Sequence, residues 1–349
     1  MKKEKMKKKY KEDTKKEKPC IATFGSHSAL QILKGAKEEG FKTLCICVKG
    51  TEQPYQSFKV ADEIILVDTY NDFFKIEKQL IAKKAILIPH ASLISYLGIE
   101  NIKKIKMPYF GEKDILRIEA DRDKQKTWIE KAGIRVPKTF ENPKDIDRVC
   151  IVKFHGADGG RGYFLVKNTA EYHTKIKGRE KDKHLIQEYV VGVPVYIHYF
   201  YSPLTQELEV LGFDKRYESN VDALGRISVK DQQAFLLDSS YTVVGNSSLV
   251  IRESLLPEIF KMGEAVVAES KKLTQKGLYG AFCLETIVTP DLKFYVFEIS
   301  ARIVAGTNVA MHGSPYSYLR YDKPMSTGRR IALEIKEAIK KKQLSKVAP

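Results

Sequence analysis

The sequence predicts an α/β protein, α+β overall, in which a small parallel-sheet domain precedes a larger part built on antiparallel strands. Short apolar runs alternate with helical stretches between Pro19 and Pro89, as in proteins with a parallel sheet. Two later apolar runs, 282–288 and 294–300, flank the turn segment 289–293 and predict a β-hairpin. No run of about 18 uninterrupted apolar residues is present, so we expect no membrane partner.

The N-terminal domain is predicted to have strands at 20–24, 43–48, 63–67 and 85–89, with helices at 29–40 and 71–84. Ligands of such sheets bind at the carboxyl ends of the strands. Two polar loops lie at those ends and offer Ser26, His27 and Ser92 as substrate contacts. A lone histidine is more often structural than catalytic, but two converging loops favour a phosphate or substrate site.

Helices and antiparallel strands alternate less regularly in the rest of the chain. Helices are expected at 124–132, 170–178, 257–273 and 326–343, and strands at 148–154, 163–167, 184–192, 195–202 and 206–218. The pattern divides the chain into a disordered basic tail at 1–18 and three further parts at 19–120, 121–192 and 193–349. The candidate substrate loops, a glycine-rich hairpin that is suited to act as a lid, and a candidate metal site fall in these three parts in that order.

Charge and cysteine usage narrow the class of protein. The formal net charge is +16, and residues 1–18 hold ten lysines against four acids, which supplies +6 of it. This tail is expected to be a solvated extension, with an RNA-binding arm as the alternative, so we expect no nucleic-acid partner for the folded part. The five cysteines fall mostly in apolar strand-like runs, and the N-terminus has no apolar signal region. Both features predict a cytoplasmic protein with reduced thiols.

Two glutamates, Glu285 and Glu298, are predicted to lie directly opposite each other across the hairpin. Opposed like charges destabilise an antiparallel pair, unless a cation lies between them. Mg²⁺ is held by one or two carboxylates together with substrate phosphates, so this pair is a candidate metal site. Ser300 and Arg302 continue the same face. The alternative is a pair of solvated glutamates on an exposed sheet face. The reverse face is expected to be apolar and to comprise Phe282, Leu284, Val288, Tyr295, Phe297 and Ile299.

A glycine-rich loop, 155–162, connects two strands, which excludes the Rossmann and P-loop motifs because both require a helix to follow. Backbone N–H groups of Gly159, Gly160 and Gly162 are candidates to fold over phosphates. Lys153, in the apolar strand before the loop, needs an anionic partner, for which a nucleotide phosphate is suited. An ordinary glycine-rich turn is the alternative interpretation.

Three further segments supply candidate contacts. Gln187, Glu188 and Val190 end a strand that leads to a hinge at Gly192, where backbone groups are able to read an adenine edge, although a plain half-buried strand fits too. Glu218 ends a charged run and is suited to ribose hydroxyls, or else belongs to a solvated turn. Thr307 lies in a polar loop that is suited to closing over the same cleft.

In combination these segments resemble the ATP-grasp fold over about residues 120–310, preceded by the small α/β domain that such enzymes use for their other substrate. The segment that includes Lys126 before AGIRVP also looks like that family's entry segment. The blocks IATFGSHSALQILKGAKEEGF, GGRGYF, DKRYESN, VIRESLLP and FEISARIVAGTN resemble the archaeal formate-dependent FAICAR synthetases, over about residues 19–345. Those enzymes make 5-formamidoimidazole-4-carboxamide ribonucleotide (FAICAR) from the 5-amino compound AICAR, formate and ATP.

The resemblance implies roles for individual residues and a set of small-molecule partners. His27, Ser92 and Asn246 would contact AICAR, Glu218 and the glycine hairpin would bind ATP, and Glu285 with Glu298 would hold Mg²⁺ or Mn²⁺. Lys153 and Arg302 would neutralise charge during transfer of the γ-phosphate to formate. A homo-oligomer is expected from the family.

This sequence departs from the family pattern at Ile118 and Ala120, and at Ser247-Ser248 after Asn246. Two other functions therefore stay open at this point. One is a paralogous ATP-grasp ligase that joins another small carboxylate to a nucleotide amine, and the other is a basic nucleotide- or RNA-binding protein.

Overall fold

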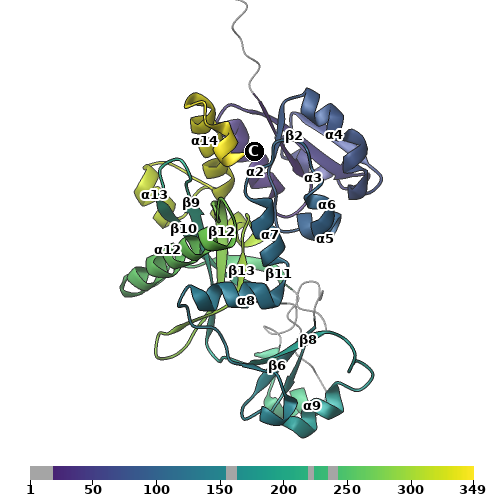
Figure 1. Cartoon of the computed structure of the whole chain (residues 1–349), viewed down its shortest axis with the longest axis vertical. Coiled ribbons are helices and arrows are strands. Elements are labelled where there is room, and N and C mark those ends of the chain that lie inside the picture. Colours follow the sequence, from purple (N-terminus) through teal and green to yellow (C-terminus); the bar gives the residue numbers. More distant parts are fainter. Residues whose placement is uncertain (1–18, 155–162, 219–223, 235–242) are drawn as a thin grey trace, which may run out of the picture. The chain divides into compact units, whose positions relative to one another are not determined.

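The structure, a computed structural model, describes residues 19–154, 163–218, 224–234 and 243–349 (Figure 1). The chain forms two compact units. Unit 1 comprises the residues up to Gly111 together with Thr327–Pro349, and unit 2 comprises Glu112–Ser326. Among the described helices, none has the length and apolar composition that a bilayer span requires.

Unit 1 contains a four-stranded sheet in the order β3-β2-β1-β4, and every neighbouring pair is parallel, as predicted. Its strands are β1 (Cys20–Phe24), β2 (Lys42–Val48), β3 (Glu63–Val67) and β4 (Ala85–Leu87). Its helices are α2 (Ala29–Glu38), α3 (Gln53–Ser57), α4 (Phe73–Ala82), α5 (Leu93–Leu97), α6 (Ile99–Ile102), α14 (Thr327–Lys340) and α15 (Leu344–Val347). Because β1 and β4 are neighbours, the loops that follow them lie at one edge of the sheet.

The C-terminal helix α14 packs against α2 in unit 1, so the packing groups the chain differently from the predicted domain boundaries (Figure 1). Two glycines allow this contact. A Cβ on Gly35 would lie 2.2 Å from the backbone nitrogen of Arg329, and one on Gly328 would lie 2.4 Å from the carbonyl oxygen of Gln31. Arg329 also pairs with the buried Glu39 at 2.8 Å. The predicted part 193–349 follows sequence order, whereas residues 327–349 pack with unit 1.

Unit 2 contains a five-stranded antiparallel sheet, β11-β10-β9-β12-β13, and a smaller antiparallel sheet, β5-β8-β6-β7. The strands are β5 (Thr139–Phe140), β6 (Cys150–Phe154), β7 (Phe164–Val166), β8 (His184–Glu188), β9 (Val193–Tyr201), β10 (Leu208–Glu218), β11 (Val243–Ser248), β12 (Gly280–Val288) and β13 (Phe294–Ser300). The helices are α7 (Lys113–Glu119), α8 (Arg122–Lys131), α9 (Thr169–Lys175), α11 (Val229–Ala234), α12 (Leu256–Leu273) and α13 (Pro315–Tyr321), with the 3₁₀ helix η5 at Ala305–Ala310.

Helices α8 and α12 cover one face of the five-stranded sheet (Figure 1). Trp128 of α8 is fully buried there, and its indole N–H donates to the carbonyl of Val266 in α12 over 3.1 Å. Apolar burial on this face supplies the main stabilisation of the sheet. The opposite face is contacted by η5 through β10 and β11, and it carries the polar side chains described below.

The hairpin β12–β13 pairs Glu285 with Glu298, which confirms the predicted register. The register shifts by one residue just beyond this pair, so Phe297 is the extra residue of a β-bulge. The predicted apolar face was therefore wrong for Tyr295 and Phe297. Phe294 and Val296 take those core positions instead, since the bulge reverses the alternation between Glu298 and the turn.

All five cysteines lie in strands and are buried free thiols, as their apolar surroundings predicted.

Candidate active site

The two facing glutamates lie on the polar face of the hairpin. Glu285 is buried, and its Oε1 accepts hydrogen bonds from Ser300 Oγ at 3.3 Å and from Arg216 Nη2 at 2.8 Å. Burial and the charge of Glu285 together raise the pKa of Glu298 above its ordinary value. A divalent cation between the two carboxylates would relieve this repulsion.

The described residues contain no cluster of three or more acidic, histidine or cysteine side chains placed to hold a metal. A two-carboxylate site fits Mg²⁺, which keeps several water or phosphate ligands.

Arg216, on β10, lies between the carboxylates and the aromatic ring of Tyr196, with its guanidinium 3.7 Å from the ring centre. Burial alone would lower the pKa of Arg216, but the ion pair with Glu285 raises it above its ordinary value. In the sequence, residues 214–218 form one charged run, in which this side chain does not stand out. Asp214 and Arg216 are two residues apart in a predicted strand, and this spacing places both side chains on one face of the sheet. That shared face was the sequence feature that could have pointed to Arg216.

Lys153, on β6, is half-buried, as its apolar strand predicted. Its ammonium donates to Gln187 Oε1 at 2.9 Å and lies 5.1 Å from the centre of the Phe297 ring. Burial lowers its pKa to about 8, although the charge of Glu298 opposes this shift. Within the described residues no carboxylate lies within 4.0 Å of the ammonium, so its charge is left for a ligand.

A cavity of about 360 Å³ opens between the two sheets of unit 2. Its walls include Lys153, Arg216, Glu285, Glu298 and the hinge segment 188–192. This volume is within the range of small-molecule and cofactor sites. The cavity therefore combines opposed carboxylates with cations and an apolar hinge, which suits a nucleotide with its metal.

The hinge approaches β12 closely, because a Cβ on Gly192 would lie 2.4 Å from the carbonyl oxygen of Val288. Gln187 is buried and bonded to Lys153, while Val190 lines the cavity. The Glu188 carboxylate accepts from the backbone N–H of Lys138 and pairs with Arg148 at 3.0 Å, so this side chain is already engaged.

The other predicted ATP contacts are Lys126, the loop glycines and Glu218, and the structure places only Lys126. Lys126 donates to Thr139 Oγ1 at 2.6 Å and pairs with Glu130 at 3.3 Å. It lines a narrower pocket that also includes Arg122, Lys153 and Gln187. Gly159, Gly160 and Gly162 lie outside the described residues, as does the side chain of Glu218 at the end of β10.

Arg302 follows β13 and pairs with Glu119 of α7, a residue that no sequence motif indicated. Nη2 of Arg302 lies 2.8 Å from Glu119 Oε1, and the backbone N–H of Ala301 donates to Oε2 at 2.7 Å. Burial raises the pKa of Glu119 even though Arg302 opposes the shift. Nε and Nη1 of Arg302 are buried and have no hydrogen-bond partner among the described residues.

Asn246, on β11, donates from Nδ2 to Asp214 Oδ2 at 2.6 Å. The other oxygen of Asp214 lies 2.7 Å from His198 Nε2, and both of these side chains are buried. Gly306 leaves room for this carboxylate, since a Cβ there would lie 2.3 Å from Asp214 Oδ1. Thr307, also in η5, is buried and donates to the carbonyl of Val304.

In unit 1 the two loops after β1 and β4 converge, as the parallel sheet predicted. Ser26 Oγ donates to Ser92 Oγ at 3.3 Å and also bonds the hydroxyl of Tyr96. His27 is exposed on the first of these loops. Ser28 is buried at the start of α2, and its hydroxyl has no partner among the described residues.

Two sequence-family profiles match the chain. One, described as a protein of unknown function (DUF1246), matches residues 21–140, and the other, described as a domain of unknown function (DUF1297), matches residues 167–348.

Curated relatives carry a more specific name. A protein of Pyrococcus abyssi is 51% identical over 334 residues, which cover 94% of this chain and 97% of the relative. One of Methanocaldococcus jannaschii is 47% identical over 344 residues, which cover 95% of each chain. Both are named 5-formaminoimidazole-4-carboxamide-1-(beta)-D-ribofuranosyl 5'-monophosphate synthetase.

Solved structures agree with this relationship. An IMP biosynthesis protein, PurP, from Thermococcus kodakaraensis superposes with a TM-score of 0.76 at 30% identity, covering 94% of this chain and all of that one. The ADP complex of purK, an N5-carboxyaminoimidazole ribonucleotide synthetase, superposes with a TM-score of 0.66 at 17% identity, covering 90% of this chain and 75% of that one, and shows the shared ATP-grasp fold alone. The chain thus belongs to the 5-formaminoimidazole-4-carboxamide-1-(beta)-D-ribofuranosyl 5'-monophosphate synthetase family.

Proposed function

We propose that this chain is an ATP-dependent ligase that formylates the 5-amino group of AICAR with formate and yields FAICAR. The observation that carries the proposal is the facing pair Glu285 and Glu298 in a cavity that also presents Lys153 and Arg216. The names of the relatives supply the substrate class, since they are synthetases of this formamido nucleotide.

Formate needs activation because its hydroxide or oxide is a very poor leaving group. In the proposed reaction a formate oxygen attacks the γ-phosphorus of ATP, which breaks the bond to ADP and forms formyl phosphate. The amine of AICAR then attacks the formyl carbon, expels inorganic phosphate and loses one proton. Catalysis of the first step is mainly positioning and neutralisation of charge, so no protein nucleophile is required.

Glu285 and Glu298 are the proposed holders of Mg²⁺ or Mn²⁺, which would neutralise the β- and γ-phosphates. Lys153 would donate to the same phosphates, because its ammonium has no carboxylate partner in the described part of unit 2. Arg216 would hold the Glu285 carboxylate in its orientation through their 2.8 Å contact. Arg302 would stabilise the negative charge of the transferring phosphoryl group or of the acyl phosphate.

Ser26, His27 and Ser92 of unit 1 are proposed contacts of AICAR. Asn246 and Thr307 are proposed separately as substrate contacts. The hydrogen bond between Ser26 and Ser92 supports the proposed contacts in unit 1. Hydroxyls at the carboxyl ends of parallel strands are suited to bind phosphate or ribose oxygens. The carboxylate of Asp214 supports the role of Asn246, because it accepts from the amide nitrogen and leaves the amide oxygen to accept from a substrate amino group.

The test compares the wild-type protein with the variant E298Q. With Mg·ATP, ¹³C-formate and AICAR, the wild-type protein should give a ¹³C-formyl product, whereas E298Q should lose formate-dependent ADP release and still bind AICAR. The matched control is E258Q, which removes a charge from an exposed glutamate outside the cavity. Normal turnover by E298Q would refute the metal assignment. Turnover by the wild-type protein only with a different small acid would indicate a paralogous ligase.

A further inference from the structure

Tyr96, in helix α5 of unit 1, is not among the residues that the proposed function assigns. Its hydroxyl forms a hydrogen bond with Ser26 Oγ, and its ring stacks on that of Tyr70, with the ring centres 4.0 Å apart and an angle of 15° between the planes. Tyr70 is fixed in turn, because its hydroxyl donates to the carbonyl of Gly25 over 2.7 Å. Tyr70 and Tyr96 come from separate segments of the chain, and together they hold the loop that follows β1.

A buried histidine joins this loop to the one that follows β4. His90 Nε2 lies 3.1 Å from the carbonyl oxygen of Phe24, so this nitrogen carries a proton and donates. Nδ1 of the same ring accepts from the backbone N–H of Ser92 over 3.2 Å, so it carries no proton. One neutral tautomer satisfies both hydrogen bonds, and it holds the two loops in a single arrangement.

The hydroxyls of Tyr96, Ser26 and Ser92 form a cluster with one consistent order of donation. A hydroxyl has a single proton, and Ser26 uses its proton to donate to Ser92 Oγ at 3.3 Å. Tyr96 must therefore be the donor in its bond with Ser26. The proton of the Ser92 hydroxyl has no acceptor among the described residues, so the hydroxyl cluster ends in a donor for a ligand.

The acceptors around the hydroxyl cluster are already engaged. The carbonyls of Phe24 and Gly25 accept from His90 and Tyr70. Each serine oxygen accepts from the preceding hydroxyl of the cluster. A ribose hydroxyl needs an acceptor for its own proton, whereas an ionised phosphate offers acceptor oxygens alone. The hydroxyl cluster therefore suits a phosphate better than a ribose hydroxyl.

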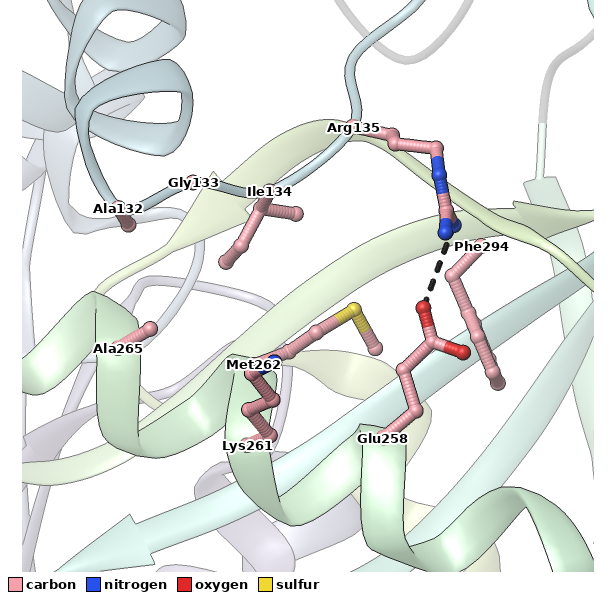
Figure 2. Close-up of a pocket in the computed structure, with 9 residues that line it drawn as sticks. All are labelled: Ala132, Gly133, Ile134, Arg135, Glu258, Lys261, Met262, Ala265 and Phe294. Carbon is pink, nitrogen blue, oxygen red and sulfur yellow. Dashed lines mark hydrogen bonds and ion pairs between the residues drawn. The ribbon is translucent and has the colours of Figure 1, made fainter.

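A ligand is able to approach the hydroxyl cluster from solvent, since His27 is exposed and Ser26 and Tyr96 are half-buried. A cavity of about 400 Å³ in unit 2 provides a contrast. Figure 2 shows its polar side, where Arg135 and Glu258 pair at 3.2 Å. Their side chains are 48% and 39% exposed, so water screens the pair and does not fix a donor for a ligand. The hydroxyl cluster, in contrast, is ordered by ring stacking and by its neighbours.

We propose that the hydroxyl cluster binds the phosphate of the nucleotide substrate, and that Tyr96 is the positioning residue that sets the direction of donation. This inference rests on the proposed function, which places AICAR at Ser26 and Ser92. Tyr96 would not contact the phosphate itself. By donating to Ser26 it would direct the Ser26 proton to Ser92 and leave the Ser92 proton for a phosphate oxygen. The protein would thereby select the nucleotide over its nucleoside.

The test compares binding of AICAR with binding of the corresponding nucleoside, which lacks the phosphate. Both are titrated by NMR into the full-length protein without ATP or formate. In Y96F the Ser26 proton is no longer directed to Ser92, so the dissociation constant of AICAR should rise about tenfold, while that of the nucleoside changes less than about threefold. S92A removes the donor and should raise the constant for AICAR about 10- to 100-fold. The double variant should be no worse than S92A by more than about threefold.

The matched control is Y316F. Tyr316 is also half-buried, and its hydroxyl accepts from the backbone N–H of Ile251 at 2.9 Å in unit 2. This variant should bind both ligands as the wild-type protein does. A second measurement follows the phosphate of bound AICAR by ³¹P NMR. Donors favour the dianion, so its second pKa should lie below the ordinary value of about 6 in the wild-type protein and should move back toward that value in Y96F.

An unchanged affinity for AICAR in a folded Y96F, or an equal loss for AICAR and the nucleoside, would overturn the inference. If Y96F does not fold, S26A interrupts the hydroxyl cluster without removing either stacked ring, and it should reduce the preference for AICAR over the nucleoside by a similar factor. Failure of the wild-type protein to bind AICAR at all would instead count against the proposed function, and the inference would fail with it.

Discussion

Lys153 gives the most precise quantitative prediction, because its ammonium loses its proton at mildly alkaline pH. Its ammonium is half-buried and lies beside the Phe297 ring, and among the described residues it bonds only to the neutral Gln187. Burial lowers its pKa from 10.5 to about 8. Bound phosphates would restore the pKa to near its ordinary value. ATP binding should therefore take up a proton when the pH lies between these two values.

The magnitude follows from the two protonation states. Between pH 7 and pH 9 the protonated fraction of a free group with a pKa of about 8 falls about tenfold. The dissociation constant of Mg·ATP should rise about tenfold over that interval, or ~1.4 kcal/mol, and should stay nearly constant below pH 7. Uptake should approach about half a proton per ATP at pH 8.

Isothermal titration calorimetry in buffers of different ionisation enthalpy measures both the affinity and the protons taken up. The variant K153R is the control, since arginine stays charged throughout this range and should remove the pH dependence. A dissociation constant that is flat from pH 7 to pH 9 in the wild-type protein, with no proton uptake, would refute the reasoning.

The remaining predictions concern stability and substrate binding. The pKa of Lys153 is lower in the folded protein (about 8) than in the unfolded chain (10.5), so its charge destabilises the nucleotide-free protein below about pH 8. This loss of folding free energy becomes smaller as the pH rises from 8 to 10.5. K153M should therefore raise the free energy of unfolding at pH 7 by about 1–2 kcal/mol while abolishing turnover, and thermal unfolding with no increase in Tm would contradict this. D214N should weaken AICAR binding about tenfold without affecting ATP, because the Asn246 amide is then free to reverse. The double exchange D214N/N246D should recover part of that loss in calorimetry, and an equal or larger loss would remove Asp214 from substrate recognition.

The sequence predicted the features that depend on local periodicity. Alternation along two strands placed Glu285 opposite Glu298, and parallel topology brought Ser26 to Ser92. The bulge at Phe297 was not predictable, because one extra residue in a strand leaves no pattern that distinguishes it from a longer turn.

Long-range ion pairs were the other feature that the sequence did not reveal. Glu119 and Arg302 lie far apart along the chain, and neither belongs to a motif that points to the other. Arg216 was seen only as one charge in a run, and its stacking on Tyr196 depends on the pairing of β9 with β10. Helix α14 likewise returns to unit 1 through contacts of Gly35 and Gly328 that sequence order cannot show.

The central claim is that ATP activates formate by transfer of its γ-phosphate in the site around Glu285 and Glu298. The most direct measurement is to supply ¹⁸O-labelled formate with Mg·ATP and AICAR, and to examine the inorganic phosphate by ³¹P NMR. The proposed reaction predicts one ¹⁸O atom in each phosphate released, because a formate oxygen stays on phosphorus when the amine displaces it. Unlabelled phosphate formed together with the formyl product would contradict the account.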